Sequence, residues 1–367
     1  MKKKHYPVYE PLLGQEELDL LEECIRTCWI SSLGRHIDLF ERTFAKFCRC
    51  QCAAATSSGT AALHLALVAL GIGRGDEVIV PDLTFVATAN SVAYTGAKVI
   101  LVDVEKETWT IDPELIKKAI TRRTKAIVGV HLYGHPFDIE RVVEIAREHD
   151  LKVIEDAAEA HGSLYKGKRV GPLADIGCFS FYGNKVITTG EGGMVVTNDP
   201  EVDARIRFLR DHSMDGKRRY FHPEIGYNYR MTNMQAAVGR AQMKRIGGIL
   251  AAKRRVAKLY SERLGGIEGI VLPPERPWAR SIFWLYTILI EKTFGPGPGD
   301  LAAHLRAGGI DTRPVFIPMH LLPMYGTRRK FPVSDMLSSS GLSLPSSPTL
   351  IEDDIDYICE MIRRSRR

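Results

Sequence analysis

Long apolar runs are missing from this sequence. No stretch approaches the roughly 20 consecutive apolar residues that a membrane-spanning helix needs. The basic start, residues 1–7, is not followed by the apolar segment of a secretory signal peptide. These absences predict a cytoplasmic protein that has no membrane partner.

Cysteine is also sparse. The seven cysteines among 367 residues are an odd number, which in a large chain favours reduced thiols over a disulfide framework. Cys48, Cys50 and Cys52 alternate along the chain, but no second pair of cysteine or histidine residues follows at the spacing of a zinc finger. The sequence therefore predicts no metal site.

Neither sign of charge dominates the chain. Lys and Arg number 50 against 44 Asp and Glu, which gives a net charge of +6. The basic runs at 253–255 and 363–367 carry no interleaved aromatic residues, so they are typical of solvated faces and predict no nucleic-acid partner. A mild positive field does suit an anionic small molecule.

What is present is a regular alternation of short apolar strands and helices. Strands are expected at 77–80, 98–102, 126–130, 151–156 and 176–182, and helices at 15–29, 40–47, 61–70, 88–94, 113–120 and 139–148. Short, wholly apolar strands of this kind predict an α/β fold with a mainly parallel sheet sandwiched by helices. Ligands of such sheets lie beyond the carboxyl ends of the strands.

A chain of this length predicts two domains. The pattern changes after a long helical stretch at 234–264, which Gly247 and Gly248 are expected to interrupt. Beyond it we expect a strand at 283–290, a helix at 300–307, an extended segment at 310–315 and a closing helix at 353–362. We therefore predict a large α/β domain over 1–245, with an N-terminal helix, and a smaller α+β domain over 246–367.

Lys185 is the most informative residue because of the segment that leads into it. The apolar run 176–182 delivers Gly183, Asn184 and then this lysine into a loop rich in Thr and Gly, and Asp156 ends the preceding strand. A lysine amine can form a Schiff base with the aldehyde of pyridoxal phosphate (PLP). A carboxylate can keep the pyridine nitrogen protonated, so that the ring accepts electrons. The pair predicts PLP chemistry, although a lone lysine is more often a solvated surface residue.

A second candidate lies where the helix at 61–70 begins. Gly59 and Thr60 would present backbone amides and a hydroxyl at the positive end of the helix dipole, which suits a phosphate. A simple N-cap by Ser58 or Thr60 explains the start of the helix equally well. The residues themselves leave both interpretations open.

Several longer strings are more specific than these single residues. Taken in order, they resemble the DegT/StrS-type sugar aminotransferases, a family of fold-type I, PLP-dependent enzymes that act on nucleotide-linked keto-sugars. The resemblance covers nearly the whole chain and rests on segments at 29–34, 56–63, 155–162, 179–185, 189–194, 226–233 and 312–320. It implies a fold-type I transferase that uses PLP as its cofactor.

The resemblance also implies roles for the residues around the cofactor ring. Lys185 would bind PLP and move the proton, and Asp156 would pair with the pyridine nitrogen. Phe85 would stack on the ring, although a core phenylalanine is the alternative. Glu159 would lie near the other face of the ring or its hydroxyl, at a position where relatives commonly have glutamine or histidine.

The phosphate end of the cofactor is assigned in the same way. Gly59, Thr60 and Ser180 would bind the phosphate, and Asn228 of a second copy would reach it from across an interface. The resemblance therefore implies a homodimer with shared active sites.

Substrate contacts are expected from residues outside this group. Arg219 and Arg313 are candidates for a diphosphate, and His320 is a candidate for the sugar. Trp29 is a further candidate for a substrate contact. His131 and His161 also stand near strand ends, but they are expected to be structural because Lys185 supplies the base.

The substrate is inferred from the resemblance of the segments around Trp29, at 131–134 and at 312–320. This resemblance implies transfer of an amino group from L-glutamate to a GDP-linked 4-keto-6-deoxymannose, which gives GDP-perosamine. A UDP- or dTDP-linked 4-keto-sugar is the alternative substrate. A sugar dehydratase of the same fold would replace Lys185 by histidine. A non-catalytic regulatory protein would be expected to lack Lys185 or Asp156.

Overall fold

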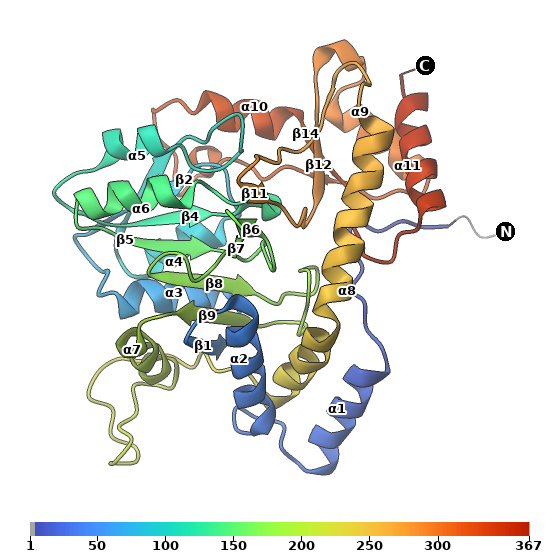
Figure 1. Cartoon of the computed structure of the whole chain (residues 1–367). Helices are drawn as coiled ribbons and strands as arrows, with labels where there is room; N and C mark the ends of the chain where they lie inside the picture. The colour runs from blue at the N-terminus through green and yellow to red at the C-terminus, as the bar shows by residue number, and fades with distance from the viewer. Residues whose placement is uncertain (1–3, 367) are drawn as a thin grey trace.

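The computed structural model of the protein describes residues 4–366. A seven-stranded sheet with the order β1-β9-β8-β5-β4-β2-β3 forms its centre (Figure 1). The strands are β1 Cys52–Thr56, β2 Glu77–Pro81, β3 Lys98–Val102, β4 Thr124–Val130, β5 Lys152–Asp156, β8 Ile176–Ser180 and β9 Gly193–Thr197. Strands β8, β5, β4, β2 and β3 pair in parallel, and β9 runs antiparallel to β1 and β8. The predicted α/β fold is confirmed, although the apolar pattern did not single out β1 and β9.

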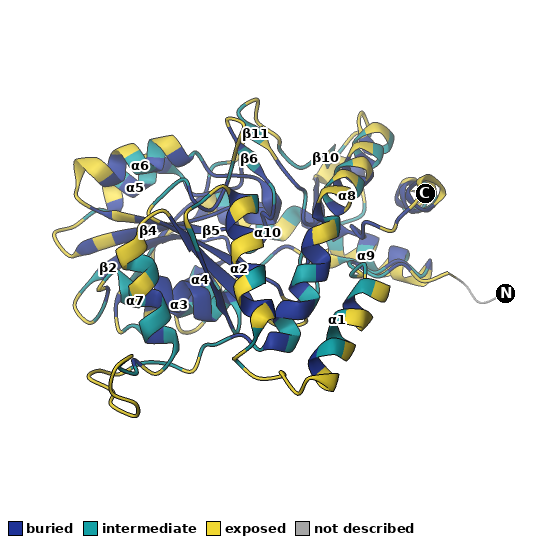
Figure 2. Ribbon diagram, turned by 60° about the horizontal axis from the view of Figure 1, so that its bottom comes forward, coloured by how far each residue is buried: buried dark blue, intermediate teal, exposed yellow. Residues whose placement is uncertain are grey.

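Helices cover both faces of this sheet. Consecutive strand residues point to opposite faces, so Ile79 packs in one cluster with Phe44, whereas Val78 and Val80 pack in another with Leu65. Burial on both sides explains why these strands are apolar throughout, and Figure 2 shows the sheet as buried between helices whose outer faces are exposed. The helices are α1 Gln15–Arg26, α2 Arg35–Cys48, α3 Gly59–Ala69, α4 Ala87–Tyr94, α5 Pro113–Ala119, α6 Ile139–Glu148, α7 Pro200–Arg210, α8 Asn233–Leu264, α9 Pro298–Ala307, α10 Pro332–Ser340 and α11 Glu352–Arg364.

A smaller antiparallel sheet, in the order β10-β12-β14-β13, lies in the C-terminal part. A separate apolar cluster surrounds it and includes Tyr6, which forms a bridge with Ile310. The N-terminal segment therefore packs with the C-terminal part. The remaining elements are β6 Leu164–Tyr165, β7 Lys168–Arg169, β10 Ile270–Val271, β11 Ala279–Arg280, β12 Tyr286–Ile290, β13 Arg313–Pro314, β14 Gly341–Leu344, and the 3-10 turns Leu132–Gly134, Lys292–Phe294 and Met319–Leu321.

Helix α8 joins the two parts and is continuous over 32 residues. The predicted interruption at Gly247 and Gly248 is therefore wrong. Both glycines are exposed, and buried Ile246 and Ile249 beside them pack the helix onto the large sheet's core. This packing outweighs the weak helix propensity of glycine. The domain boundary that we propose, just before Ile246, falls inside this helix. Within residues 4–366, no helix is long and apolar enough to cross a membrane.

Two glycines of α8 should respond in opposite ways to alanine. A Cβ at Gly239 would lie 2.6 Å from Phe40 Cζ, so Gly239→Ala should lower the free energy of unfolding by about 1–3 kcal/mol. A Cβ at Gly247 would meet no atom within 4 Å. Gly247→Ala should therefore raise the free energy of unfolding by about 0.5–1 kcal/mol, because alanine favours the helix. Urea unfolding measures both changes, and effects of the same sign would contradict this account of α8.

Candidate active site

A cavity of about 350 Å³ opens beyond the carboxyl ends of β4, β5 and β8. In Figure 1 the arrowheads of β5 and β8 point to the side of the sheet where α8 stands. A volume of this size is typical of small-molecule sites. The cavity brings together these predicted residues: Gly59, Thr60, Phe85, Asp156, Glu159, Ser180 and Lys185.

The Lys185 side chain is largely buried in the cavity wall, with 12% of its surface exposed. After β8 the loop turns at Tyr182, whose carbonyl accepts a hydrogen bond from Lys185 N at 2.9 Å. Lys185 Nζ lies 3.7 Å from Glu159 Oε1 and 3.7 Å from the ring centroid of Trp284. Burial lowers the pKa of the amine, and the Glu159 carboxylate opposes this shift. The amine is thus less firmly protonated than a solvated lysine, as a general base requires.

Asp156 supplies a buried carboxylate at the end of β5. Thr88 Oγ1 donates to Asp156 Oδ2 at 2.8 Å, and Ala158 N donates to Oδ1 at 3.2 Å. Burial raises the pKa of Asp156, and the hydrogen bonds from Thr88 and Ala158 oppose that rise. These donors fix the carboxylate at the cavity wall, where it can bind a protonated ring nitrogen.

Glu159 is the second buried carboxylate. Tyr133 N donates to Glu159 Oε2 at 2.7 Å, and Tyr133 adopts the left-handed backbone conformation that non-glycine residues rarely occupy. Burial raises the pKa of Glu159 to about 7, and the positive charge of Lys185 opposes the rise. A carboxyl that titrates near neutrality beside the amine can exchange a proton with it.

The start of α3 forms one end of the cavity. Ser58 Oγ accepts a hydrogen bond from Ala61 N at 3.1 Å, so Ser58 is the N-cap of the helix. A Cβ at Gly59 would lie 2.7 Å from Ser180 Cβ, so only glycine lets the helix start approach β8 this closely. Amides in a first helical turn have no partner within the helix, and Thr60 adds a hydroxyl. Capping and a phosphate seat are therefore compatible here.

Aromatic side chains form the walls. Phe85 is 54% exposed on the cavity side, and its ring centroid lies 5.7 Å from that of Phe316. Trp284 Nε1 donates to the Asn184 carbonyl at 2.6 Å, which holds the indole over Lys185. Trp284 and Phe316 were not predicted. Both come from irregular C-terminal segments, where no periodic pattern marks a wall residue.

Two histidines near the strand ends are buried outside the cavity lining. His131 Nε2 lies 3.0 Å from Glu155 Oε2, and both side chains are fully buried. His161 is buried against the rings of Phe44 and Phe179, and burial lowers its pKa to about 3. Neither histidine lines the cavity.

Two predicted substrate residues in the C-terminal part also lie outside the cavity lining. His320 Nδ1 is 2.7 Å from Asp82 Oδ2, and the His320 ring stacks on Phe331. Arg313 is exposed in β13, which is an edge strand of the smaller sheet. Their predicted contacts with sugar and diphosphate remain predictions, and His320 instead fastens its segment to the residue that follows β2.

Three further predicted residues lie on exposed segments outside the cavity lining. Asn228 Oδ1 accepts a hydrogen bond from Arg230 Nη2 at 2.9 Å. Arg219 lies in the exposed loop after α7 with its guanidinium 5.0 Å from the Tyr220 ring centroid. Trp29 lines a groove at the α1–α2 connection. None of the three lines the cavity of its own chain.

The donor set of the cavity fits PLP. The start of α3 suits the phosphate, the aromatic walls suit the ring, Asp156 suits the ring nitrogen and Lys185 suits the aldehyde. At the start of α3, a Cβ on Gly59 would lie 2.7 Å from Ser180 Cβ, so a larger residue would crowd the proposed phosphate site. Within residues 4–366, no cluster of three or more His, Cys, Asp or Glu residues could hold a metal ion.

The chain belongs to the DegT/DnrJ/EryC1/StrS aminotransferase family, whose profile matches residues 11–363. It is 47% identical to the GDP-perosamine synthase of Caulobacter vibrioides, over 96% of this chain and 95% of that protein. It is 46% identical to the GDP-perosamine synthase of Escherichia coli O157:H7, over 98% of each. The crystal structure of S. venezuelae DesV has a TM-score of 0.91 at 36% identity, covering 96% of this chain and 94% of that chain. The protein is a PLP-dependent sugar aminotransferase.

Glu159→Gln should lower the pKa of the Lys185 amine in the cofactor-free protein. The Glu159 carboxylate favours the ammonium form, and an amide does not. More of the amine is then neutral at a given pH, so acylation of Lys185 should reach its half-maximal rate at a lower pH. Peptide mass spectrometry after brief acylation at a series of pH values measures this midpoint.

Glu191→Gln is the matched control. Glu191 lines the same cavity, but across the described residues its carboxylate makes no ion pair with Lys185. The control should keep the wild-type midpoint. An unchanged or higher midpoint in Glu159→Gln would refute the proton exchange between Glu159 and Lys185.

Proposed function

We propose that the protein transfers the amino group of L-glutamate to a GDP-linked 4-keto-6-deoxymannose and so forms GDP-perosamine. The observation that carries the aminotransfer is the desolvated Lys185 amine beside Glu159 and Asp156. The sugar is supported by the two relatives named GDP-perosamine synthase, and a UDP- or dTDP-linked 4-keto-sugar is the alternative. We place the reaction in the cytoplasm and its product in O-antigen synthesis for lipopolysaccharide.

Bound in this cavity, PLP supplies a carbon that carries the amino group and a ring that delocalises the electrons of a deprotonated carbon. Gly59 and Thr60 would hold its phosphate with backbone amides and a hydroxyl, together with Ser180. Asp156 would keep the ring nitrogen protonated, and Phe85 would cover the ring.

Lys185 Nζ moves the proton in both halves of the reaction. It removes a proton from the glutamate carbon that bears the amino group, and it delivers one to the sugar carbon that was a ketone. Glu159, 3.7 Å away and with a pKa of about 7, takes up or returns the extra proton of this amine near neutral pH. Trp284 covers the amine and keeps water from it.

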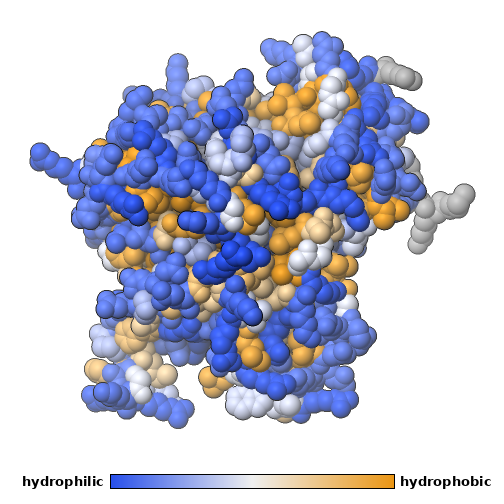
Figure 3. Space-filling view, in the orientation of Figure 1, coloured by the Kyte–Doolittle hydropathy of each residue, from blue (hydrophilic) through white to orange (hydrophobic). Residues whose placement is uncertain are grey.

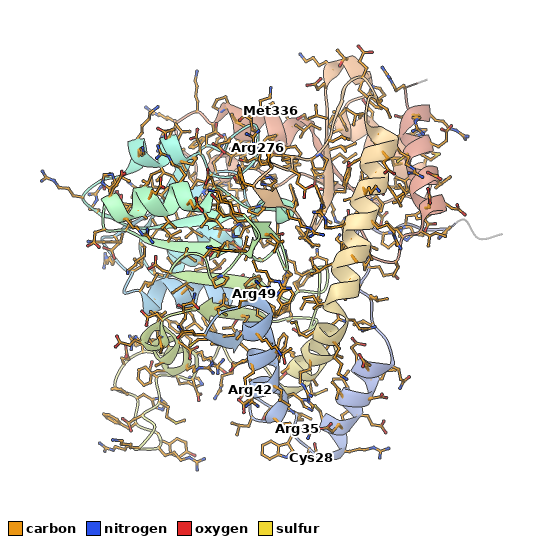
Figure 4. The ribbon with its side chains drawn as sticks, viewed as in Figure 1. Cys28, Arg35, Arg42, Arg49, Arg276 and Met336 are labelled. Carbon is orange, nitrogen blue, oxygen red and sulfur yellow. The ribbon has the colours of Figure 1, made fainter. Side chains whose placement is uncertain are left out.

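We also propose that a second copy of the chain completes each site. Asn228, Arg219 and Trp29 lie outside the cavity of their own chain. The segment from Arg219 to Asn228 exposes two large apolar side chains: Tyr220 is 75% exposed and Ile225 is 85% exposed. The loop after α7 and the α1–α2 connection project at the lower edge of the view in Figure 3, which shows apolar and polar residues mixed on both. Figure 4 labels Cys28 and Arg35 at the same edge, at the α1–α2 connection. An interface there would bury these side chains.

Mixed dimers test the shared site. Lys185→Ala and Asn228→Ala homodimers should each be impaired. If Asn228 serves the partner's cavity, mixing the two variants creates one intact site per mixed dimer and restores about a quarter of wild-type turnover after random re-association. No recovery in mixed dimers, with their formation verified by mass, would show that Asn228 acts within its own chain or not at all.

Catalytic efficiency with three nucleotide families tests the substrate. GDP-, UDP- and dTDP-linked 4-keto-6-deoxy sugars are compared with glutamate as donor under identical conditions. A site that hydrogen-bonds guanine should reject the pyrimidine nucleotides by about 100-fold or more, because its polar groups are left unpaired. A preference for UDP- or dTDP-sugar would overturn the GDP assignment and leave the aminotransferase reaction intact.

A further inference from the structure

Lys253 is a buried amine for which the reaction has no use. It lies on α8 and is 1% exposed. Its Nζ donates to the Trp284 carbonyl at 2.8 Å and also to the Ser346 carbonyl. The Tyr9 ring centroid lies 5.1 Å from Nζ. No carboxylate in the described part of the chain pairs with it.

Burial without a counter-charge is unfavourable for an ammonium group. It lowers the pKa of Lys253 to about 7, and burial is the whole cause of that shift. An apolar side chain of similar length would fill the same space without losing hydration. What the amine contributes instead is a fixed position for the two carbonyls that it binds.

The first of these carbonyls belongs to the wall of the active site. Trp284 N donates to the Tyr133 carbonyl at 2.8 Å, and Trp284 Nε1 donates to the Asn184 carbonyl at 2.6 Å. With the Lys253 bond, the Trp284 backbone is held on both its N–H and its C=O. The indole centroid consequently stays 3.7 Å from Lys185 Nζ.

The second carbonyl belongs to a junction of chain segments. Ser346 Oγ accepts a hydrogen bond from Tyr286 N at 2.8 Å, and Ser346 N donates to the Val8 carbonyl at 2.8 Å. Tyr9 OH donates to the Val186 carbonyl, next to Lys185, at 3.1 Å. Lys253 therefore joins α8 to the start of β12, to the segment after β14 and to the N-terminal segment, all next to the catalytic loop.

We propose that Lys253 is a positioning residue for Lys185, because it holds the Trp284 carbonyl and so keeps the indole face against the catalytic amine. An indole face stabilises an ammonium group electrostatically. The position of Trp284 thus influences how much of the Lys185 amine is protonated. The charged groups that face Lys185 are Glu159 and Asp156, and changes at Lys253 leave both in place.

A double-mutant cycle tests this role. Lys253→Met keeps an apolar stem but has no donor, and Trp284→Leu removes the aromatic face. The pH midpoint of Lys185 acylation in the cofactor-free protein should move in the same direction, by similar amounts, in both variants. The midpoint in the double variant should shift no further than in Trp284→Leu alone, because Lys253 acts through Trp284.

Steady-state kinetics of the PLP-loaded enzyme give a second measurement. In Lys253→Met, kcat should fall about tenfold while KM for the sugar stays within about twofold.

Lys258→Met is the matched control on the same helix. Lys258 is exposed and pairs with Glu262, so this variant should keep the wild-type midpoint and kcat. Should Lys253→Met fail to fold, Lys253→Gln enters the same cycle. Additive shifts in the double variant, or a wild-type midpoint in a folded Lys253 variant, would overturn the proposal. It rests on Lys185 as the catalytic amine, but the acylation measurement needs no sugar, so it can fail while the proposed substrate stands.

Discussion

The active site depends on the partial desolvation of one amine. A lysine in water stays protonated at neutral pH, and here burial lowers its pKa toward the range in which it can accept a proton from carbon. Complete burial without partners would carry too high a cost, so the fold places Glu159 and the Trp284 ring each 3.7 Å from Lys185 Nζ. The rest of the structure serves to hold these groups together.

The large sheet brings the charged groups to one edge. Parallel strands end side by side, so Asp156 at the end of β5 and Lys185 in the loop after β8 reach the same cavity. The amine and the two carboxylates are largely buried. Both carboxylates oppose the lowered pKa of the amine, and the charge of the amine opposes the raised pKa of each carboxylate. The hydrogen bonds from Thr88 to Asp156 and from Tyr133 to Glu159 oppose the rise in pKa that burial causes in the two carboxylates.

Helix α8 couples this edge of the sheet to the C-terminal part. Its first half packs against α1 and α2, and its second half contacts α11. Because the helix is unbroken, the wall that carries Trp284 is tied to the large sheet through one rigid element. Lys253 stands on this helix and binds the wall directly. An active site built from two parts of a chain needs a connection of this kind to keep its geometry.

Much of this arrangement could be predicted from the sequence. Apolar strands alternating with helices indicate a parallel sheet because burial on both faces leaves a local, continuous pattern. Strand ends then indicate where Lys185 and Asp156 meet, and a glycine before a helix indicates where an anion fits. The long ordered strings in the chain identified the family, and the structural and sequence relatives agree with that assignment.

What only the tertiary structure decided concerns contacts between segments far apart in the chain. The sequence pattern could not show that Trp284 covers Lys185, that Lys253 is buried without a counter-charge, or that His320 binds Asp82. It also suggested a break at Gly247, where packing on either side keeps the helix intact. Local propensity and periodicity report what one segment prefers. Burial, pKa and side-chain position depend on which other segments surround it, and only the folded chain determines that.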